Sequence, residues 1–369
     1  MELILKNGKL LDIKNNFLYK KSDILVKDGR IERIAEVIDK PGVKEIDLRD
    51  KIISPGFIDV HVHCFPKNTV ISAIPDSIGI KMGVTSIIDA GTAGADTMDE
   101  FYEEFVLKSK TRIFSNLNIS SLGLRTLSEL SNLNNIEKEK IEKIIRRYKG
   151  VIVGLKARAS GSVVKEQGIE PIKRAKQIAR ELKLPLVVHI GNAPPKVEEV
   201  LNLLEKGDVV THCYNNKKTG LIREGNVIPE VFKAKKKGVL FDVGHGSESF
   251  SFDTAKIALE KDFEAELIGT DLYERNILKP VQSLETTINK MWNLGVPLER
   301  CIEKVTNIPA QVFKLNNLGE LKKGFFADFT IFEIKNDKIQ VEDSVGVKLE
   351  INKYIKIKLV YIKEELIEI

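Results

Sequence analysis

Five histidines are the residues of this chain with the clearest capacity for chemistry, and two of them are only one residue apart. His61 and His63 end an apolar run that begins at Phe57 and follows Pro55-Gly56. Because side chains alternate between the two faces of a strand, both imidazoles would point the same way and could bind one metal ion. The alternative is a pair of partly buried histidines that are satisfied by hydrogen bonds alone.

The other three histidines stand in the same kind of position. His189, His212 and His245 each follow a short apolar or β-branched run, at the point where small and polar residues begin. Such a transition indicates a strand that ends in a loop. We therefore expect the histidines to act together if these strand ends lie close to one another in the fold.

Eight apolar runs of strand length divide the middle of the chain, and most of the intervals between them have helical periodicity, for instance 171–182 and 197–204. This alternation predicts an α/β protein built on a (β/α)8 TIM barrel. A doubly wound open sheet is the alternative, but it would need a glycine-rich phosphate loop where His61 and His63 stand. The eight runs lie near residues 57–62, 85–90, 112–119, 151–155, 186–190, 209–212, 239–243 and 267–270.

Both ends of the chain have the pattern of strands and contain no histidine or cysteine. Near the N-terminus, Asn7-Gly8 and Asp28-Gly29 stand between apolar arms, which is the signal of a tight hairpin. The last part of the chain alternates between apolar and polar residues. We expect residues 1–52 and 315–369 to form one small β-sandwich domain beside a barrel of residues 53–314.

In a parallel barrel the C-terminal ends of all strands meet at one face, where active sites form. Asp271 ends the eighth run and Lys156 ends the fourth, so both would join the histidines there. A lysine ammonium beside metal ions would be repelled strongly. If the amine has reacted with carbon dioxide, however, the carbamate is an anion that could bridge two metal ions. The alternative is a Lys156 that pairs with a carboxylate and an Asp271 that caps a turn.

This set of residues resembles the metal site of the binuclear amidohydrolase superfamily, which includes dihydroorotases and related deacetylases. The segments 154–158 and 242–246 resemble its amidohydrolase/deacetylase branch, which is often labelled dihydroorotase-like. Tyr273 departs from the pattern, because relatives often place another histidine there. The likeness covers essentially the whole chain, since segments of the flanking sheet are also similar: Asn7-Gly8-Lys9, Asp28-Gly29-Arg30-Ile31, Pro55-Gly56-Phe57-Ile58-Asp59 and Gly324-Phe325-Phe326-Ala327-Asp328.

The resemblance implies two divalent metal ions as cofactors, zinc before others, with carbon dioxide bound as a carbamate on Lys156. The first two histidines and the aspartate would hold the more buried ion, the next two histidines the more exposed one, and the carbamate and a hydroxide would bridge them. Asp271 would take the proton of the attacking hydroxide and give it to the leaving group. The implied metal ligands are His61, His63, Lys156, His189, His212 and Asp271.

Four further residues are candidates for contact with a substrate. His245, between two glycines, could reach over the metal ions as a catalytic or substrate-binding group, and a hydrogen-bonded loop histidine is its alternative. Arg158 lies two residues beyond Lys156 and could grip a substrate carboxylate, unless it forms a salt bridge with a barrel acid. Asn192 and Tyr214 follow metal-site strands and would line the pocket.

We expect a metal-dependent hydrolase that cleaves an amide or ester bond by deacylation of a small, carboxylate-bearing molecule. Within this class the alternative is a dihydroorotase or another cyclic amidohydrolase. From other classes, the alternatives are a barrel without catalysis that serves as an assembly scaffold, and a metal-storage or sensor module. Either would retain the fold without hydrolytic turnover.

Composition excludes some other kinds of partner. A net charge of +5 without a basic face or interleaved aromatic residues argues against nucleic acids. No apolar stretch approaches the roughly 18 residues that span a bilayer, so no membrane association is expected. The three cysteines, an odd number without a Cys-x-x-Cys pair, are typical of a reducing compartment, and we expect a cytoplasmic enzyme. A homo-oligomer is compatible with the sequence, which does not specify the oligomeric state.

Overall fold

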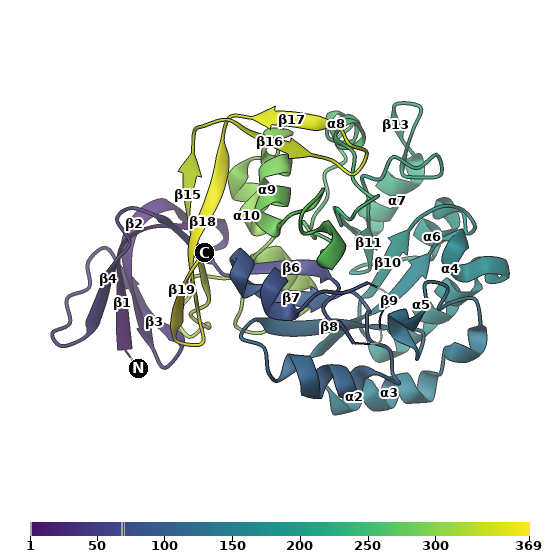
Figure 1. The fold of residues 1–369 in the computed structure, drawn as a ribbon, viewed down its shortest axis with the longest axis horizontal. Coiled ribbons are helices and arrows are strands. Elements are labelled where there is room, and N and C mark those ends of the chain that lie inside the picture. The colour runs from purple at the N-terminus through teal and green to yellow at the C-terminus, as the bar shows by residue number, and fades with distance from the viewer. Residues whose placement is uncertain (1, 68, 70) are drawn as a thin grey trace.

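Parallel strands form the centre of the molecule, in a computed structural model that describes residues 2–67, 69 and 71–369. Within this part of the chain, seven strands pair in sequence order and curve into a barrel wall (Figure 1). Every pair in this wall is parallel, and most are joined by a segment that contains a helix. The strands are β6 (Phe57–Val62), β7 (Val84–Asp89), β8 (Arg112–Asn118), β9 (Ile152–Ala159), β10 (Leu186–Ile190), β11 (Val209–Thr211) and β14 (Leu240–Asp242).

The eighth position of the barrel is filled by residues 267–272, which make isolated bridges instead of a strand ladder. Leu267 bridges to Asp242 in β14, and Leu272 bridges to Val62 in β6. The segment therefore joins the two edges of the wall but departs from the predicted strand over 267–270. Asp271, with a φ of 55°, takes the left-handed conformation and interrupts the extended backbone between the two bridges.

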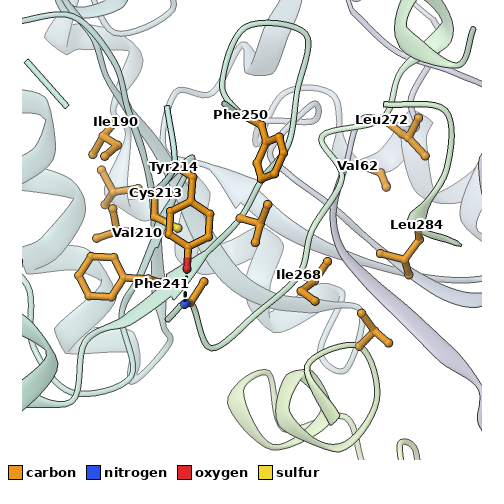
Figure 2. Close-up of a cluster of buried hydrophobic side chains, with 14 of the residues drawn as sticks. Val62, Ile190, Val210, Cys213, Tyr214, Phe241, Phe250, Ile268, Leu272 and Leu284 are labelled. Carbon is orange, nitrogen blue, oxygen red and sulfur yellow. Dashed lines mark hydrogen bonds between the residues drawn. The ribbon is translucent and has the colours of Figure 1, made fainter. Parts of the chain in front are cut away.

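Helices cover the outside of the wall, and the two predicted at 171–182 and 197–204 are present as α5 and α6. They pack on a layer of buried apolar side chains, part of which Figure 2 shows between Val210, Phe241 and Leu284. The α-helices are α1 (Pro75–Ile78), α2 (Met98–Phe101), α3 (Lys138–Arg147), α4 (Gly161–Val164), α5 (Glu170–Leu182), α6 (Val197–Leu203), α7 (Pro229–Lys237), α8 (Phe252–Glu260), α9 (Leu284–Asn293), α10 (Leu298–Glu303) and α11 (Asn307–Val312).

Short elements complete the barrel. A π-helical turn at Tyr102–Val106 continues α2, and a small hairpin pairs β12 (Ile222–Arg223) with β13 (Asn226–Val227). The turns of 3-10 helix are Ile13–Asn15, Ile80–Met82, Gly123–Arg125, Leu133–Asn135, Lys165–Gln167 and Glu274–Asn276. In the part of the chain that the structure describes, no helix is long and apolar enough to cross a membrane.

The interior of the barrel at the N-terminal end of its strands is a packed apolar core. Side chains from β6, β7, β9, β10 and β11 meet residues of α11 and the loop after it, and this contact fills the end of the barrel. Because this end is filled with hydrocarbon, polar chemistry is confined to the opposite, C-terminal end of the strands. The buried members include Ile58, Val60, Ile88, Val153, Val187, Val209, Ala310 and Phe313.

Strands from both ends of the chain come together in one sheet beside the barrel, so the predicted association of the two termini is present (Figure 1). Its order is β19-β18-β15-β5-β1-β2-β3, and β4 pairs with β1. A separate hairpin of β16 and β17 extends from it toward α8. The strands are β1 (Glu2–Asp12), β2 (Phe17–Lys27), β3 (Arg30–Ala35), β4 (Lys44–Asp47), β5 (Ile52–Pro55), β15 (Phe329–Lys335), β16 (Ile339–Glu342), β17 (Lys348–Ile351), β18 (Tyr354–Ile362) and β19 (Glu365–Glu368).

Candidate metal centre

Four histidines and one aspartate, drawn from strand ends around the barrel, lie close together at its C-terminal face. Asp271 Oδ1 is 3.1 Å from His63 Nε2 and 3.4 Å from His61 Nε2. Ligand atoms of His61, His212 and Asp271 all lie within 4.8 Å of one another. His189 joins the group through His212, since their ring centroids are 4.4 Å apart. The structure therefore brings these predicted residues to one place.

The Nδ1 atoms of His212 and His61 are each held by a protein acceptor. His212 Nδ1 lies 2.6 Å from the carbonyl oxygen of Gly244, which can only accept, so Nδ1 carries the proton and Nε2 is free to bind a metal ion. His61 Nδ1 lies 2.8 Å from Thr211 Oγ1, which itself donates to Asp242 Oδ2 at 2.7 Å. The Thr211 hydroxyl proton is thus directed away from His61, and the imidazole again presents Nε2 to the centre.

His63 is also held through Nδ1. Its Nδ1 lies 2.8 Å from Thr92 Oγ1, while its Nε2 faces Asp271. A histidine that is held through one ring nitrogen and exposes the other to a shared centre is the usual geometry of a metal ligand. The donor set of imidazoles and a carboxylate suits a divalent transition metal such as zinc.

Lys156 is buried in the same centre. Its side chain lies on β9, the residue is 1% exposed, and its Nζ is 3.3 Å from His61 Nε2. Burial lowers the pKa of Lys156 to about 8, because the low-dielectric interior disfavours the ammonium. The neutral amine that burial favours is the form that can react with carbon dioxide. Gly91 makes room for this side chain, since a Cβ there would lie 2.7 Å from Lys156 Cβ.

The charge states of the other groups also fit a metal site. Burial lowers the pKa of His61 and of His189 well below the ordinary value, and lowers the pKa of His212 to about 4. These imidazoles are therefore neutral, as metal binding requires. Burial alone would raise the pKa of Asp271, but the neighbouring histidines outweigh it and hold that pKa below its usual range. The aspartate is accordingly an ionised carboxylate.

Two of these residues have an unusual backbone conformation. His212 has a φ of 69° and Asp271 a φ of 55°, which is the left-handed region that residues with a side chain rarely adopt. Each conformation comes where the regular strand pattern ends, and it turns the side chain into the centre. Such strain is maintained only where the surrounding structure holds it, and it concentrates at functional sites.

His245 does not join the centre, which corrects the expectation that it contacts substrate. The residue is fully buried and its ring stacks on Phe250, with the centroids 4.5 Å apart. Its Nε2 lies 2.8 Å from Lys290 Nζ, and its Nδ1 lies 3.0 Å from the carbonyl oxygen of Gly246. Both ring nitrogens are thus occupied by partners within the protein, and neither is left for a substrate.

Tyr214 is also turned away from the centre, contrary to the expectation that it lines the pocket. It is fully buried, and its hydroxyl donates to the carbonyl oxygen of Phe263 and accepts from the amide of Ala265. Figure 2 shows its ring in the apolar layer beside Cys213 and Phe241. Asn192 lies exposed in the loop after β10, and its role at a pocket stays a prediction.

Arg158 forms the salt bridge that was its alternative role, yet it keeps free donors. Its Nη1 lies 3.2 Å from Oε2 of Glu129, a carboxylate that is fully buried. Nε and Nη2 have no hydrogen-bond partner among the described residues, and 15% of the side chain is exposed. The guanidinium is therefore fixed on one side and available on the other.

Several residues that support the site were not identified from the sequence. Thr211 directly precedes His212, and Asp242 ends β14, so the strand-end rule that selected the histidines could have found both. Thr92 and Glu129 stand in loops without a local signal, because their roles depend on contacts between distant segments.

Comparison with known proteins agrees with this geometry. A model described as the amidohydrolase family matches residues 52–363. A deacetylase of Enterococcus faecalis is 40% identical over 351 residues, which cover 94% of this chain and 93% of the relative. A deacetylase of Brucella anthropi is 38% identical over 338 residues, which cover 90% and 84%.

Two solved structures are similar in both sequence and fold. A crystal structure of an adenine deaminase has a TM-score of 0.95 and 38% identity, with 99% of each chain covered. A crystal structure of a dihydroorotase has a TM-score of 0.93 and 34% identity, with 100% of this chain and 97% of the other covered. The barrel and the family predicted from the sequence are confirmed. The chain belongs to the amidohydrolase family and is a metal-dependent hydrolase of amide bonds.

Proposed function

We propose that the enzyme removes an acyl group from a small, carboxylate-bearing molecule at a centre that holds two metal ions. One observation carries this proposal: four imidazoles from three strand ends, a buried lysine and an ionised aspartate face one another, and three of the imidazoles are held at Nδ1 by hydrogen bonds to the protein. Among the described residues, most of the atoms that face the centre have no partner outside it. A pair of cations explains why so many basic groups are buried together.

The proposed ligands divide into two sets that share Lys156. His61, His63 and Asp271 would hold one ion, since Asp271 Oδ1 lies within 3.4 Å of both Nε2 atoms. His189 and His212 would hold the other. We propose zinc, which suits imidazole and carboxylate donors, and a carbamate on Lys156 as the shared anion. When bound, such ions lower the pKa of water to about 7 and polarise a carbonyl group.

Asp271 acts first as the proton acceptor and then as the proton donor. As an ionised carboxylate it accepts a proton from the attacking water while a new carbon–oxygen bond forms at the substrate carbonyl. The carbon–nitrogen bond then breaks, and Asp271 returns the proton to the leaving amine. The products are a carboxylic acid and a free amine, and the aspartate recovers its charge.

Arg158 is the proposed site for the substrate carboxylate. Its salt bridge with Glu129 fixes the guanidinium, while Nε and Nη2 remain available to form a bidentate pair with an anion. The relatives described as deacetylases favour an acetyl group as the one that is removed. Opening of a small cyclic amide is the second candidate, which the similar dihydroorotase structure favours.

The location of the enzyme is also a proposal. All three cysteines are free and buried, which fits a reducing compartment such as the cytoplasm. The substrate is then a small molecule of that compartment.

A substrate panel tests the proposed function. The zinc-loaded enzyme is assayed with N-acetyl amino acids, dihydroorotate, adenine and 4-nitrophenyl acetate. We expect acetate release from at least one N-acetyl amino acid, and a loss of about a thousandfold in Asp271→Asn, which keeps the size of the side chain but cannot accept the proton. Turnover of dihydroorotate alone would establish the second candidate, and turnover of adenine alone would contradict both.

Arg158→Met separates carboxylate recognition from catalysis. We expect KM for the N-acetyl amino acid to rise about tenfold to a hundredfold, since a charge-assisted pair is lost. Hydrolysis of 4-nitrophenyl acetate, which carries no carboxylate, serves as the matched control and should change little. An equal loss with both substrates would contradict the assignment of Arg158.

A further inference from the structure

The catalytic Asp271 lies between two neighbouring segments of the barrel rim. On one side, its amide donates to the carbonyl oxygen of His61 at 2.6 Å. On the other, the amide of His245 donates to Gly269 and the amide of Gly246 donates to Thr270, at 3.1 and 2.9 Å. A Cβ at Gly246 would lie 2.6 Å from Asp271 Oδ2, so the backbone of Gly246 lies directly against the carboxylate.

The carbonyl group of Gly246 is held by two donors. His245 Nδ1 lies 3.0 Å from this oxygen, and the hydroxyl of Ser344 donates to it at 2.7 Å. A carbonyl oxygen has two lone pairs, and here both are used. The peptide that faces Asp271 is therefore fixed by a side chain from its own loop and by one from the distant C-terminal segment.

The orientation of the His245 ring is set in turn by Lys290 of α9. Because the carbonyl oxygen of Gly246 can only accept, His245 Nδ1 must carry the proton, and Nε2 then accepts from Lys290 Nζ at 2.8 Å. Lys290 also donates to the carbonyl oxygen of Pro280 at 2.7 Å. Each hydrogen bond in this chain has a fixed donor and a fixed acceptor. None of the side chains can therefore rotate without the loss of a buried hydrogen bond.

The turn that carries Ser344 is itself docked on the barrel. It connects β16 and β17, and Figure 1 shows this hairpin beside α8. Asp343 Oδ2 accepts from the amide of Phe252, and the amide of Ser344 donates to the carbonyl oxygen of Phe250, both at 2.9 Å. The C-terminal hairpin thereby reaches the loop that follows β14, although some 90 residues separate them in sequence, as in the pair of Phe252 and Asp343.

We propose that Ser344, His245 and Lys290 are positioning residues that hold Gly246, and through it the carboxylate of Asp271, in the geometry needed for proton transfer. The hairpin of β16 and β17 then contributes to the active site through Ser344. None of the three residues touches the substrate. The inference rests on the proposed role of Asp271 as the proton acceptor.

Variants at Ser344 test the inference in the zinc-loaded enzyme, with 4-nitrophenyl acetate and the best N-acetyl amino acid as substrates. Ser344→Ala removes one donor to Gly246 and should lower kcat about tenfold, because small displacements of a catalytic group reduce the rate steeply. KM and zinc content should stay unchanged. Ser344→Thr retains the hydroxyl and should restore kcat, and Lys290→Met should lower kcat in the same way.

Gln340→Ala, an exposed position on β16 of the same hairpin, is the matched control and should behave as the wild type. Wild-type kcat in both Ser344→Ala and Lys290→Met would overturn the inference, and so would an equal loss in Ser344→Thr and Ser344→Ala. A parallel loss of zinc in Ser344→Ala would also overturn it. Full activity of Asp271→Asn would instead overturn the proposed function, so the two failures are distinguishable.

Discussion

Lys156 Nζ lies 3.3 Å from His61 Nε2, and both groups are buried at the C-terminal end of the barrel. Two basic nitrogens that are this close together and shielded from water cannot both be charged without a large cost in free energy. Burial resolves part of the conflict, because it favours the neutral form of each. The proposed carbamate on Lys156 would resolve the rest, since it would convert a competitor of the metal ions into a ligand.

Removal of the Lys156 side chain should therefore abolish metal binding and activity together. Lys156→Ala is expected to lose about a thousandfold or more in kcat, because metal ions contribute several kcal/mol to the stabilisation of the transition state. Formate, acetate or propionate should restore part of the activity by filling the space with a carboxylate. Metal content by mass spectrometry and turnover with and without these acids are the measurements.

Lys176→Ala is the matched control for Lys156, because it also removes a buried lysine. Lys176 pairs with the buried Asp208 at 2.6 Å, in a contact between α5 and the start of β11. Its loss should cost about 3 kcal/mol of folding stability. The folded fraction should nevertheless bind metal normally. Full metal content in Lys156→Ala would contradict the bridging role.

Thr211 should act on the metal centre without touching a metal ion. Thr211→Val keeps the shape but removes the hydroxyl that holds His61 Nδ1, and metal affinity should fall about 10- to 100-fold. Thr330→Val is the control, since Thr330, in β15 of the terminal sheet, is also buried and its hydroxyl donates to the carbonyl oxygen of Gly83. Competition with a chelator measures the affinity. Equal affinities in both variants would show that Thr211 does not orient His61.

Gly246 should be intolerant of any side chain. Gly246→Ala places a Cβ 2.6 Å from Asp271 Oδ2, and the displaced carboxylate should lower kcat about 100-fold. Gly225→Ala provides the comparison, because Gly225 also has a positive φ but has no neighbouring atom within 4 Å. Both variants carry the backbone strain, and only the first should lose activity. Similar kinetics in the two variants would show that Gly246 does not restrict Asp271.

Lys290 should make folding stability depend on pH. Burial lowers its pKa from 10.5 to about 7 against the opposing effect of Asp343 and Glu342, and His245 faces it as a neutral imidazole. Between about pH 7 and about pH 10 the unfolded chain then binds the proton and the folded chain does not, so this group makes stability rise with pH. Urea denaturation should show this rise in the wild type relative to Lys290→Met. A constant difference between the two proteins would contradict the lowered pKa.

Local patterns in the sequence were sufficient for the main architecture. Apolar runs of strand length at regular spacing indicated the barrel, and the same runs placed His189, His212 and Asp271 at their ends. This inference succeeds because a parallel barrel brings all strand ends to one face. The run at 267–270 was also located correctly, but its replacement of a ladder by single bridges depends on the left-handed backbone at Asp271, which composition does not reveal.

The sequence was misleading where long-range contacts decide the orientation of a side chain. The glycines beside His245 suggested an open loop, whereas Phe250, Lys290 and Ser344 enclose the ring. Tyr214 follows a metal-site strand, but the left-handed conformation of His212 ends the regular alternation there, and the ring enters the apolar layer. No pattern of neighbouring residues contains this information.

Diffraction from crystals grown with zinc, measured at the zinc absorption edge, tests the two-metal centre most directly. We predict two anomalous peaks, one beside His61, His63 and Asp271 and one beside His189 and His212. Electron density should extend the Lys156 side chain by a carboxylate group between the two peaks. An absence of anomalous signal at these residues, or a free Lys156 amine beside filled sites, would contradict this account.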